Sequence, residues 1–146
     1  MSVSLRNLVQ LLLTLAFMAV QTEQLFAHPR RLTVAQMTEL VRVYMAPDGG
    51  KYGFVVEDAG EETHFAGFRY FNVLTNDPNV LVIYMDHIAV DERTGDVWFA
   101  NGCDAYTSQT LAQAQKALRM KIGISDTEYR RLRRPGPYCD GAPYVP

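Results

Sequence analysis

The sequence predicts an α+β domain in which an N-terminal helix packs on a three- to four-stranded antiparallel sheet, followed by one or two C-terminal helices tied by a disulfide. Apolar residues recur at helical spacing near the start of the chain and again near its end. Alternating or continuous apolar segments lie between these two regions. Because the expected strands are grouped rather than interleaved with helices, an antiparallel sheet is favoured over a parallel one.

The first 27 residues have the layout of a secretory signal peptide. Arg6 precedes a mostly apolar run at 8–20, and a small residue, Ala27, stands at the expected cleavage position. An uncleaved membrane anchor is the alternative, but the run is shorter than the ~20 residues of a spanning helix. We therefore expect an exported protein, periplasmic or secreted, whose mature chain is one domain at 28–146. Length and an ordinary composition, with 48% hydrophobic residues, exclude a disordered tail.

Export determines how the two cysteines are interpreted. In an oxidising compartment an even pair is expected to form a disulfide, here between Cys103 and Cys139. The bond would close a helical arm at 103–139 against a helix-plus-sheet core at 33–99. The alternative, a nucleophilic Cys103, lacks a neighbouring histidine or basic residue that would lower the pKa of its thiol.

The first helix is expected to begin at Thr33, which forms a capping box with Gln36. Pro47 and the glycines that follow it stop the pattern. The apolar stripe that predicts about three turns consists of Val34, Met37, Val41, Tyr44 and Met45.

The strand region begins with an alternating segment at 52–57, and a turn is expected at 58–62. The aromatic-rich segment 64–74 favours a second strand, with Gly67 as a possible bulge. The continuous apolar run at 80–84 is typical of a strand covered on both faces and is expected to continue to Val90.

A short turn at 91–96, with glycine at its penultimate position, then predicts a hairpin into 97–99. After it, Thr107 or Ser108 can cap a helix that Gly123 ends. The stripe of that helix is Leu111, Ala114, Leu118 and Ile122. Ser125 and Glu128 form a second capping box that opens a short final helix.

The helix, the strands and the hairpin together resemble a PepSY-type domain over residues 33–99. The hairpin at 90–97 has the pattern Val-Asp-x-x-Thr-Gly-x-Val. The resemblance implies an exported, non-catalytic binding or inhibitory module of the cell envelope. The linker between the second and third expected strands departs from the family pattern, and so does the disulfide-tied segment 103–146.

The charge of the chain is divided unevenly. Residues 28–104 carry 6 basic and 12 acidic side chains, whereas residues 105–146 carry 7 basic and 3 acidic ones. Such asymmetry often marks an interaction surface, and the alternative is an arm that neutralises the acidic sheet by folding onto it. The expected partner is an envelope or secreted protein, with weak anionic lipid contact possible and nucleic acid excluded by export. The basic candidates are Lys116, Arg119, Arg130, Arg131, Arg133 and Arg134.

Two aromatic residues, Tyr70 and Trp98, join this candidate surface if one face of the sheet stays open, because Tyr and Trp are enriched at protein interfaces. No catalytic motif and no nucleotide-binding loop occurs, so no cofactor is expected. The sequence therefore favours a protein-binding module, such as an inhibitor or a toxin-immunity protein. The alternative is a metal-binding protein or metal-dependent enzyme that uses His64, His87 and Asp86, although their spacing matches no common ligand motif.

Overall fold

The computed structural model describes residues 30–48, 53–62, 64–79 and 84–141. The chain divides into Met1–Arg30 and a compact unit, Arg31–Pro146, which contains every helix and strand described below. The expected signal peptide lies outside the described residues. In the described ranges, no helix is both long enough and apolar enough for a membrane span.

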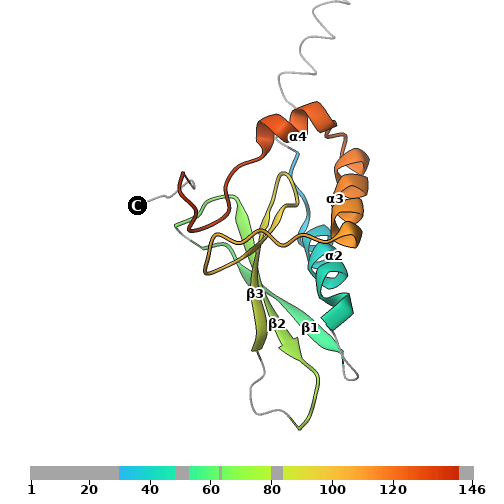
Figure 1. Ribbon diagram of the computed structural model, residues 1–146, viewed down its shortest axis with the longest axis vertical. Helices are drawn as coiled ribbons and strands as arrows, with labels where there is room; N and C mark the ends of the chain where they lie inside the picture. Colours follow the sequence, from blue (N-terminus) through green and yellow to red (C-terminus); the bar gives the residue numbers. More distant parts are fainter. Residues whose placement is uncertain (1–29, 49–52, 63, 80–83, 142–146) are drawn as a thin grey trace, which may run out of the picture. The chain divides into compact units, whose positions relative to one another are not determined.

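The predicted α+β architecture is confirmed (Figure 1). A helix precedes a sheet whose strands follow one another in the order β1-β2-β3-β4, each antiparallel to its neighbour, and two helices follow. The elements are α2 (Val34–Met45), the 3-10 turn η1 (Ala46–Asp48), β1 (Phe54–Gly60), β2 (Phe68–Thr75), β3 (Tyr84–Asp91), β4 (Val97–Phe99), α3 (Gln109–Lys121) and α4 (Asp126–Leu132).

Each helix follows a capping residue that the sequence indicated, and of the two candidates for α3 the N-cap is Ser108, not Thr107. Thr33 Oγ1 accepts a hydrogen bond from the Gln36 N–H, and Gln36 Oε1 accepts one from the Thr33 N–H at 2.8 Å, which completes the capping box of α2. Ser108 accepts from the N–H of Leu111 at the start of α3. Ser125 does the same for α4 by accepting from the N–H of Glu128.

The expected turn at 58–62 begins too early, because β1 continues to Gly60. Asp58 still pairs with Phe71, and the register shifts between Asp58 and Gly60. Arg69 on β2 holds Asp58 in the strand through two hydrogen bonds, Nε to Oδ1 at 2.8 Å and Nη2 to Oδ2 at 2.6 Å. This pair with the neighbouring strand accompanies the extension of β1 past the start of the expected turn, and local composition does not show it. Most of the continuous apolar run, residues 80–83, lies outside the described residues.

The hairpin between β3 and β4 forms as expected, and the side chain of the first residue of its turn, Asp91, stabilises that turn. Asp91 Oδ1 accepts hydrogen bonds from the backbone N–H groups of Arg93 and Thr94. Gly95 has φ +72°, a conformation that favours glycine, and a Cβ there would lie 2.9 Å from the buried Leu40 side chain, so a larger residue would also disturb the packing.

One face of the sheet packs against α2 and α3. Inward side chains of β2, β3 and β4 alternate toward these helices, as a period of two demands. The buried residues of this first core are Leu32, Met37, Leu40, Val41, Met45, Phe71, Val73, Ile88, Val90, Val97 and Leu111.

The opposite face has a second core at the hairpin end of the sheet. Its buried members are Phe65, Phe68, Tyr70, Ala89, Trp98 and Ala100. The chain after α4 covers this cluster: Gly136 lies against the Trp98 ring, and the rings of Tyr138 and Phe65 are 4.6 Å apart.

The predicted disulfide between Cys103 and Cys139 is confirmed. Cys103 follows β4, and Cys139 lies in the segment that covers the second core, 36 positions later. The bond therefore fastens the end of the described chain to the sheet.

Candidate binding surface

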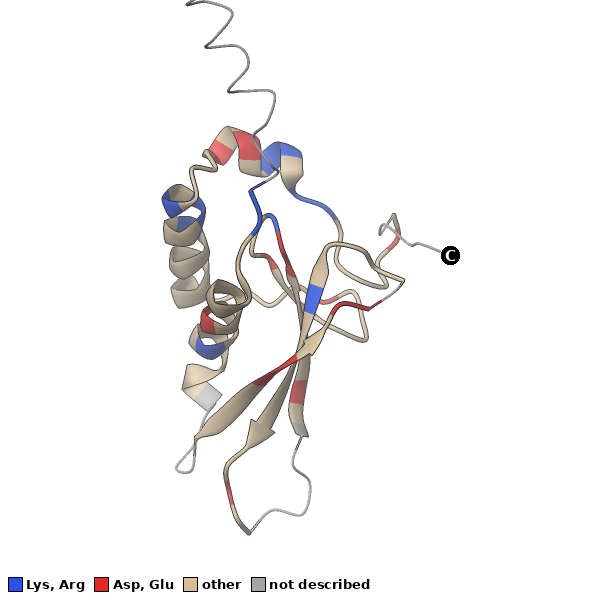
Figure 2. Ribbon diagram, turned by 180° about the vertical axis from the view of Figure 1, so that it is seen from behind, with Lys and Arg blue, Asp and Glu red and all other residues tan. Residues whose placement is uncertain are grey.

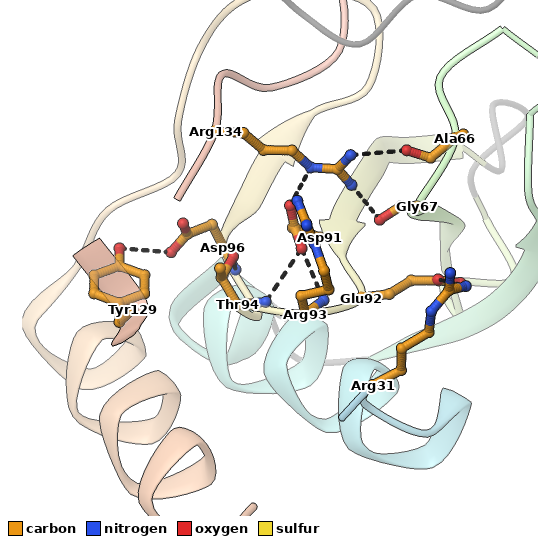
Figure 3. Close-up of polar contacts among 10 residues, drawn as sticks. All are labelled: Arg31, Ala66, Gly67, Asp91, Glu92, Arg93, Thr94, Asp96, Tyr129 and Arg134. Atoms are coloured by element: carbon orange, nitrogen blue, oxygen red, sulfur yellow. Dashed lines mark hydrogen bonds and ion pairs between the residues drawn. The ribbon is translucent and has the colours of Figure 1, made fainter. Parts of the chain in front are cut away.

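The β3–β4 hairpin is the point at which the C-terminal arm attaches to the sheet (Figure 3). Arg134, which follows α4, donates from Nε to Oδ2 of Asp91, and from its other nitrogens to the backbone carbonyls of Ala66 and Gly67 at 2.9 and 2.6 Å. Its guanidinium also lies 4.1 Å from the centroid of the Phe68 ring. Asp91 is almost fully buried, so its charge depends on Arg134 and on the turn N–H groups for compensation.

A second arm contact surrounds Asp96 at the end of the same turn. The Tyr129 hydroxyl of α4 donates to Asp96 Oδ1 at 2.9 Å. Arg119 of α3 donates to the Thr94 carbonyl at 3.0 Å and lies over the Tyr129 ring at 3.9 Å. Burial raises the pKa of the Asp96 carboxyl above its ordinary value, although hydrogen bonds from Tyr129 and Thr94 and the charge of Arg119 act in the opposite direction.

These contacts show that part of the basic arm folds onto the acidic sheet and neutralises it. Arg119 and Arg134 are largely buried and pair with carboxylates of the acidic half, at 3.8 Å between Arg119 Nη1 and Asp96 Oδ1. Two of the six basic candidates therefore hold the arm on the sheet and are not exposed for a partner.

The other basic candidates face solvent. Arg130, Arg131 and Arg133 are exposed at the end of α4 and just after it, where Figure 2 shows basic residues gathered. Lys116 of α3 is exposed as well, and its Nζ lies 3.6 Å from Asp126 Oδ2 in an ion pair at the surface. We call Lys116, Arg130, Arg131 and Arg133 the basic patch.

Tyr70 and Trp98 occupy a different environment from the one expected. Tyr70 is 1% exposed and Trp98 8% exposed, because the segment after α4 covers them. The expectation that they belong to an exposed aromatic surface is therefore wrong for both. The covering segment contains no apolar periodicity that would have predicted its position.

The three metal-ligand candidates do not converge. Asp86 and His87 are neighbours on β3 and point to opposite faces, as strand geometry demands. Asp86 accepts a 2.7 Å hydrogen bond from the Tyr106 hydroxyl beside the first core, whereas the His87 ring lies 5.7 Å from that of Tyr70 in the second core. His64 precedes β2. Within the described ranges, no three His, Cys, Asp or Glu side chains gather in a way that could hold a metal ion.

Sequence reasoning missed an apolar groove of about 400 Å³ between α2 and α3. Small and aliphatic side chains form its walls, and Glu39 and Lys121 stand exposed at its margin. Ala114 and Ala117, three positions apart on α3, and Ala35 on α2 were the available signal, because small side chains fill little of the space between two neighbouring helices. The lining residues are Ala35, Gln36, Glu39, Leu40, Val43, Ala114, Ala117, Leu118 and Lys121.

Comparison with known proteins places the fold. No protein-family model matches the chain, and no curated protein matches it. A solved structure of a type VI secretion system effector–immunity complex from Pseudomonas protegens contains a chain with a similar fold. The TM-score is 0.53 at 24% sequence identity, over 69% of this chain and 85% of that chain. The likeness establishes a shared fold, and the PepSY resemblance stays a prediction.

Proposed function

We propose that this protein is a small exported protein-binding module that inhibits a secreted toxin, in the manner of an immunity protein. The carrying observation is the fold shared with a chain of an effector–immunity complex, over most of the length of both chains. The leader pattern at 1–27 supports export, as does the disulfide between Cys103 and Cys139. The PepSY resemblance, where an inhibitory envelope module is expected, points the same way.

The basic patch is the surface proposed to bind the toxin. Its four side chains extend from two consecutive helices and the residue after them, and three of them lie within four positions of the chain. Buried contacts hold these helices on the sheet, so the charges are presented on a fixed support. Such a patch favours an acidic surface on the partner and accelerates encounter with it.

A co-expression experiment tests the proposal. Toxin genes adjacent to the gene for this protein are expressed in a susceptible bacterium, with each toxin directed either to the periplasm or to the cytoplasm. The full-length chain should restore growth against one toxin delivered to the periplasm. A version without residues 1–27 should fail against the same toxin. Growth that no adjacent toxin impairs, or that the full-length chain never restores, contradicts the proposal.

The basic patch is tested in the same assay. Replacement of Arg130, Arg131 and Arg133 by Ala should reduce protection and slow association, with an effect that grows as ionic strength falls. Arg42→Ala is the matched control, because Arg42 is an exposed arginine on α2, outside the patch. Equal protection by both variants would exclude the patch as the contact surface.

A further inference from the structure

The sheet has one long edge that no strand covers within the described residues. β4 is short, and its outer side is bridged by Ala105 through Trp98. β1 forms the other edge, with β2 on one side only. An edge strand offers a row of unpaired backbone N–H and C=O groups that can accept a strand from another molecule.

The register identifies the outward groups of β1. The Asn76 N–H donates to the Gly53 carbonyl, and Phe54 pairs with Thr75 one step along. Hydrogen-bonded and non-bonded pairs alternate along an antiparallel ladder, so the backbone groups of Phe54, Val56 and Asp58 point away from β2. The side chains of Phe54 and Val56 pack against the first core, which fixes the backbone that presents these groups.

The other side chains of β1, which alternate with Phe54 and Val56, make this edge partly apolar and mainly acidic. Val55 is 40% exposed and Glu57 is exposed, and both point to the face opposite α2. Asp58, Glu61 and Glu62 continue the acidic stretch, and Arg69 pairs with it from β2, with its Nη1 3.8 Å from Glu61 Oε1. Figure 2 shows acidic residues along β1 and just beyond its end.

We propose that the β1 edge, from Phe54 to Asp58, accepts an extended basic segment of the partner protein as an added strand. The inference rests on the proposed function and names a second surface, opposite in charge to the basic patch. Backbone hydrogen bonds to the outward groups supply affinity. A basic side chain opposite Glu57 and an apolar one opposite Val55 select the segment, because cross-strand pairs of opposite charge stabilise a sheet.

A second copy of this chain fits the same edge poorly. It would bring its own Glu57 and Asp58 to a ladder of only a few residues, and like charges close together across a sheet destabilise it. The acidic side chains therefore oppose self-pairing and favour a basic strand.

The test uses a seven-residue peptide as the probe, in which a Val and a Lys stand two positions apart so that they can lie opposite Val55 and Glu57 on one face, and a twin with Glu in place of Lys. Each is added to the isotopically labelled protein, while backbone amide shifts and hydrogen exchange are followed by NMR. The Lys peptide should shift the amides of Phe54, Val56 and Asp58 and slow their exchange, and the Glu peptide should not. Shifts at other sites alone, no shifts at millimolar peptide, or equal effects of both peptides would overturn the proposal.

Two variants separate backbone from charge. Val56→Pro removes one outward N–H without touching the ladder to β2, and it should abolish the amide shifts. Glu57→Lys keeps the backbone intact, so it remains informative if the proline variant unfolds, and it should weaken binding of the Lys peptide about tenfold or more. Sedimentation of the protein alone should show a monomer; a dimer lost in Glu57→Lys or Val56→Pro would assign the edge to a second copy and overturn the inference.

Failure of this inference is distinct from failure of the proposed function. Growth protection that survives both Val56→Pro and Glu57→Lys leaves the toxin-inhibitor proposal in place and excludes the β1 edge. Protection that is lost in both variants, but kept in Arg42→Ala, supports the edge.

Discussion

Arg134 joins the segment after α4 to Asp91, the residue that opens the β3–β4 turn 43 positions earlier. The guanidinium meets a carboxylate that is almost fully buried and also satisfies two backbone carbonyls. One side chain therefore connects the β3–β4 turn, the start of β2 and the C-terminal arm.

Arg134→Ala should destabilise the protein by about 3 kcal/mol, because it leaves the buried Asp91 carboxylate without its cation. Arg134→Lys should recover only part of the loss, since a lysine cannot reproduce the forked contacts to Asp91, Ala66 and Gly67. The free energy of unfolding from urea titration measures both effects. The adjacent, exposed Arg133→Ala should change it by no more than about 0.5 kcal/mol. Equal values for the two alanine variants would show that the pair contributes no stability.

Gly136→Ala should displace the segment that covers the second core. A Cβ at this position would overlap the Trp98 ring, far inside van der Waals contact. Trp98 is the one tryptophan of the sequence, so its fluorescence should shift to longer wavelength as water reaches the ring. Gly102→Ala is the control, because its nearest atom, on Phe99, is 3.1 Å away and can yield. An unchanged emission spectrum in Gly136→Ala would contradict the described packing.

Removal of the Cys103–Cys139 bond should cost about 4 kcal/mol, from the entropy of the loop that it closes in the unfolded chain. The measurement compares unfolding of the oxidised protein with that of a Cys103→Ala, Cys139→Ala double variant. With reductant present, the two proteins should unfold at nearly the same urea concentration. Detection of two free thiols in the exported protein by alkylation and mass analysis would refute the bond.

Acid should weaken the contact between Asp58 and Arg69. The hydrogen bond from Arg69 lowers the pKa of Asp58 below its ordinary value of 3.8, so the folded protein binds this proton less tightly than the unfolded chain does. The pair therefore stabilises the fold above pH 3.8, and its contribution is lost as the pH falls through the lower folded pKa. Asp58→Asn should be less stable than the wild type at pH 7, by under about 1 kcal/mol for so exposed a pair.

The difference between wild type and Asp58→Asn should shrink steadily below about pH 4 in urea titrations. In an Arg69→Gln background, Asp58→Asn should have little further effect at any pH, because the pair is already broken. A difference that stayed constant from neutral to acid pH would assign the stabilisation to another interaction.

Features that depend on residues close together in the sequence were predictable. The capping box of Thr33 and Gln36 and the stripe that follows it locate α2, because helix initiation and amphipathicity are local properties. The pair Cys103 and Cys139 could be matched since no other cysteine competes.

Features that depend on distant partners were not predictable. Asp58 lies in β1 and pairs with Arg69, eleven positions away, although the composition of the segment around Asp58 favours a turn. Tyr70 and Trp98 are buried by a segment rich in turn residues, which carries no periodic signal. Arg134 resembles Arg133 in sequence, yet it alone pairs with Asp91, because only the folded arm brings it there.

Both ends of the folded unit meet at the β3–β4 turn: the Leu32 N–H donates to the Glu92 carbonyl at 2.7 Å, and Arg134 reaches Asp91 from the other end. Folding rates fall when the contacts that complete a fold join residues far apart in the chain. The second core closes only after residues 134–139 reach the sheet. During synthesis, which proceeds from the N-terminus, the C-terminal arm is therefore the last part of the chain to join the fold. Truncation before Arg134 would leave the aromatic cluster of Phe65, Tyr70 and Trp98 uncovered.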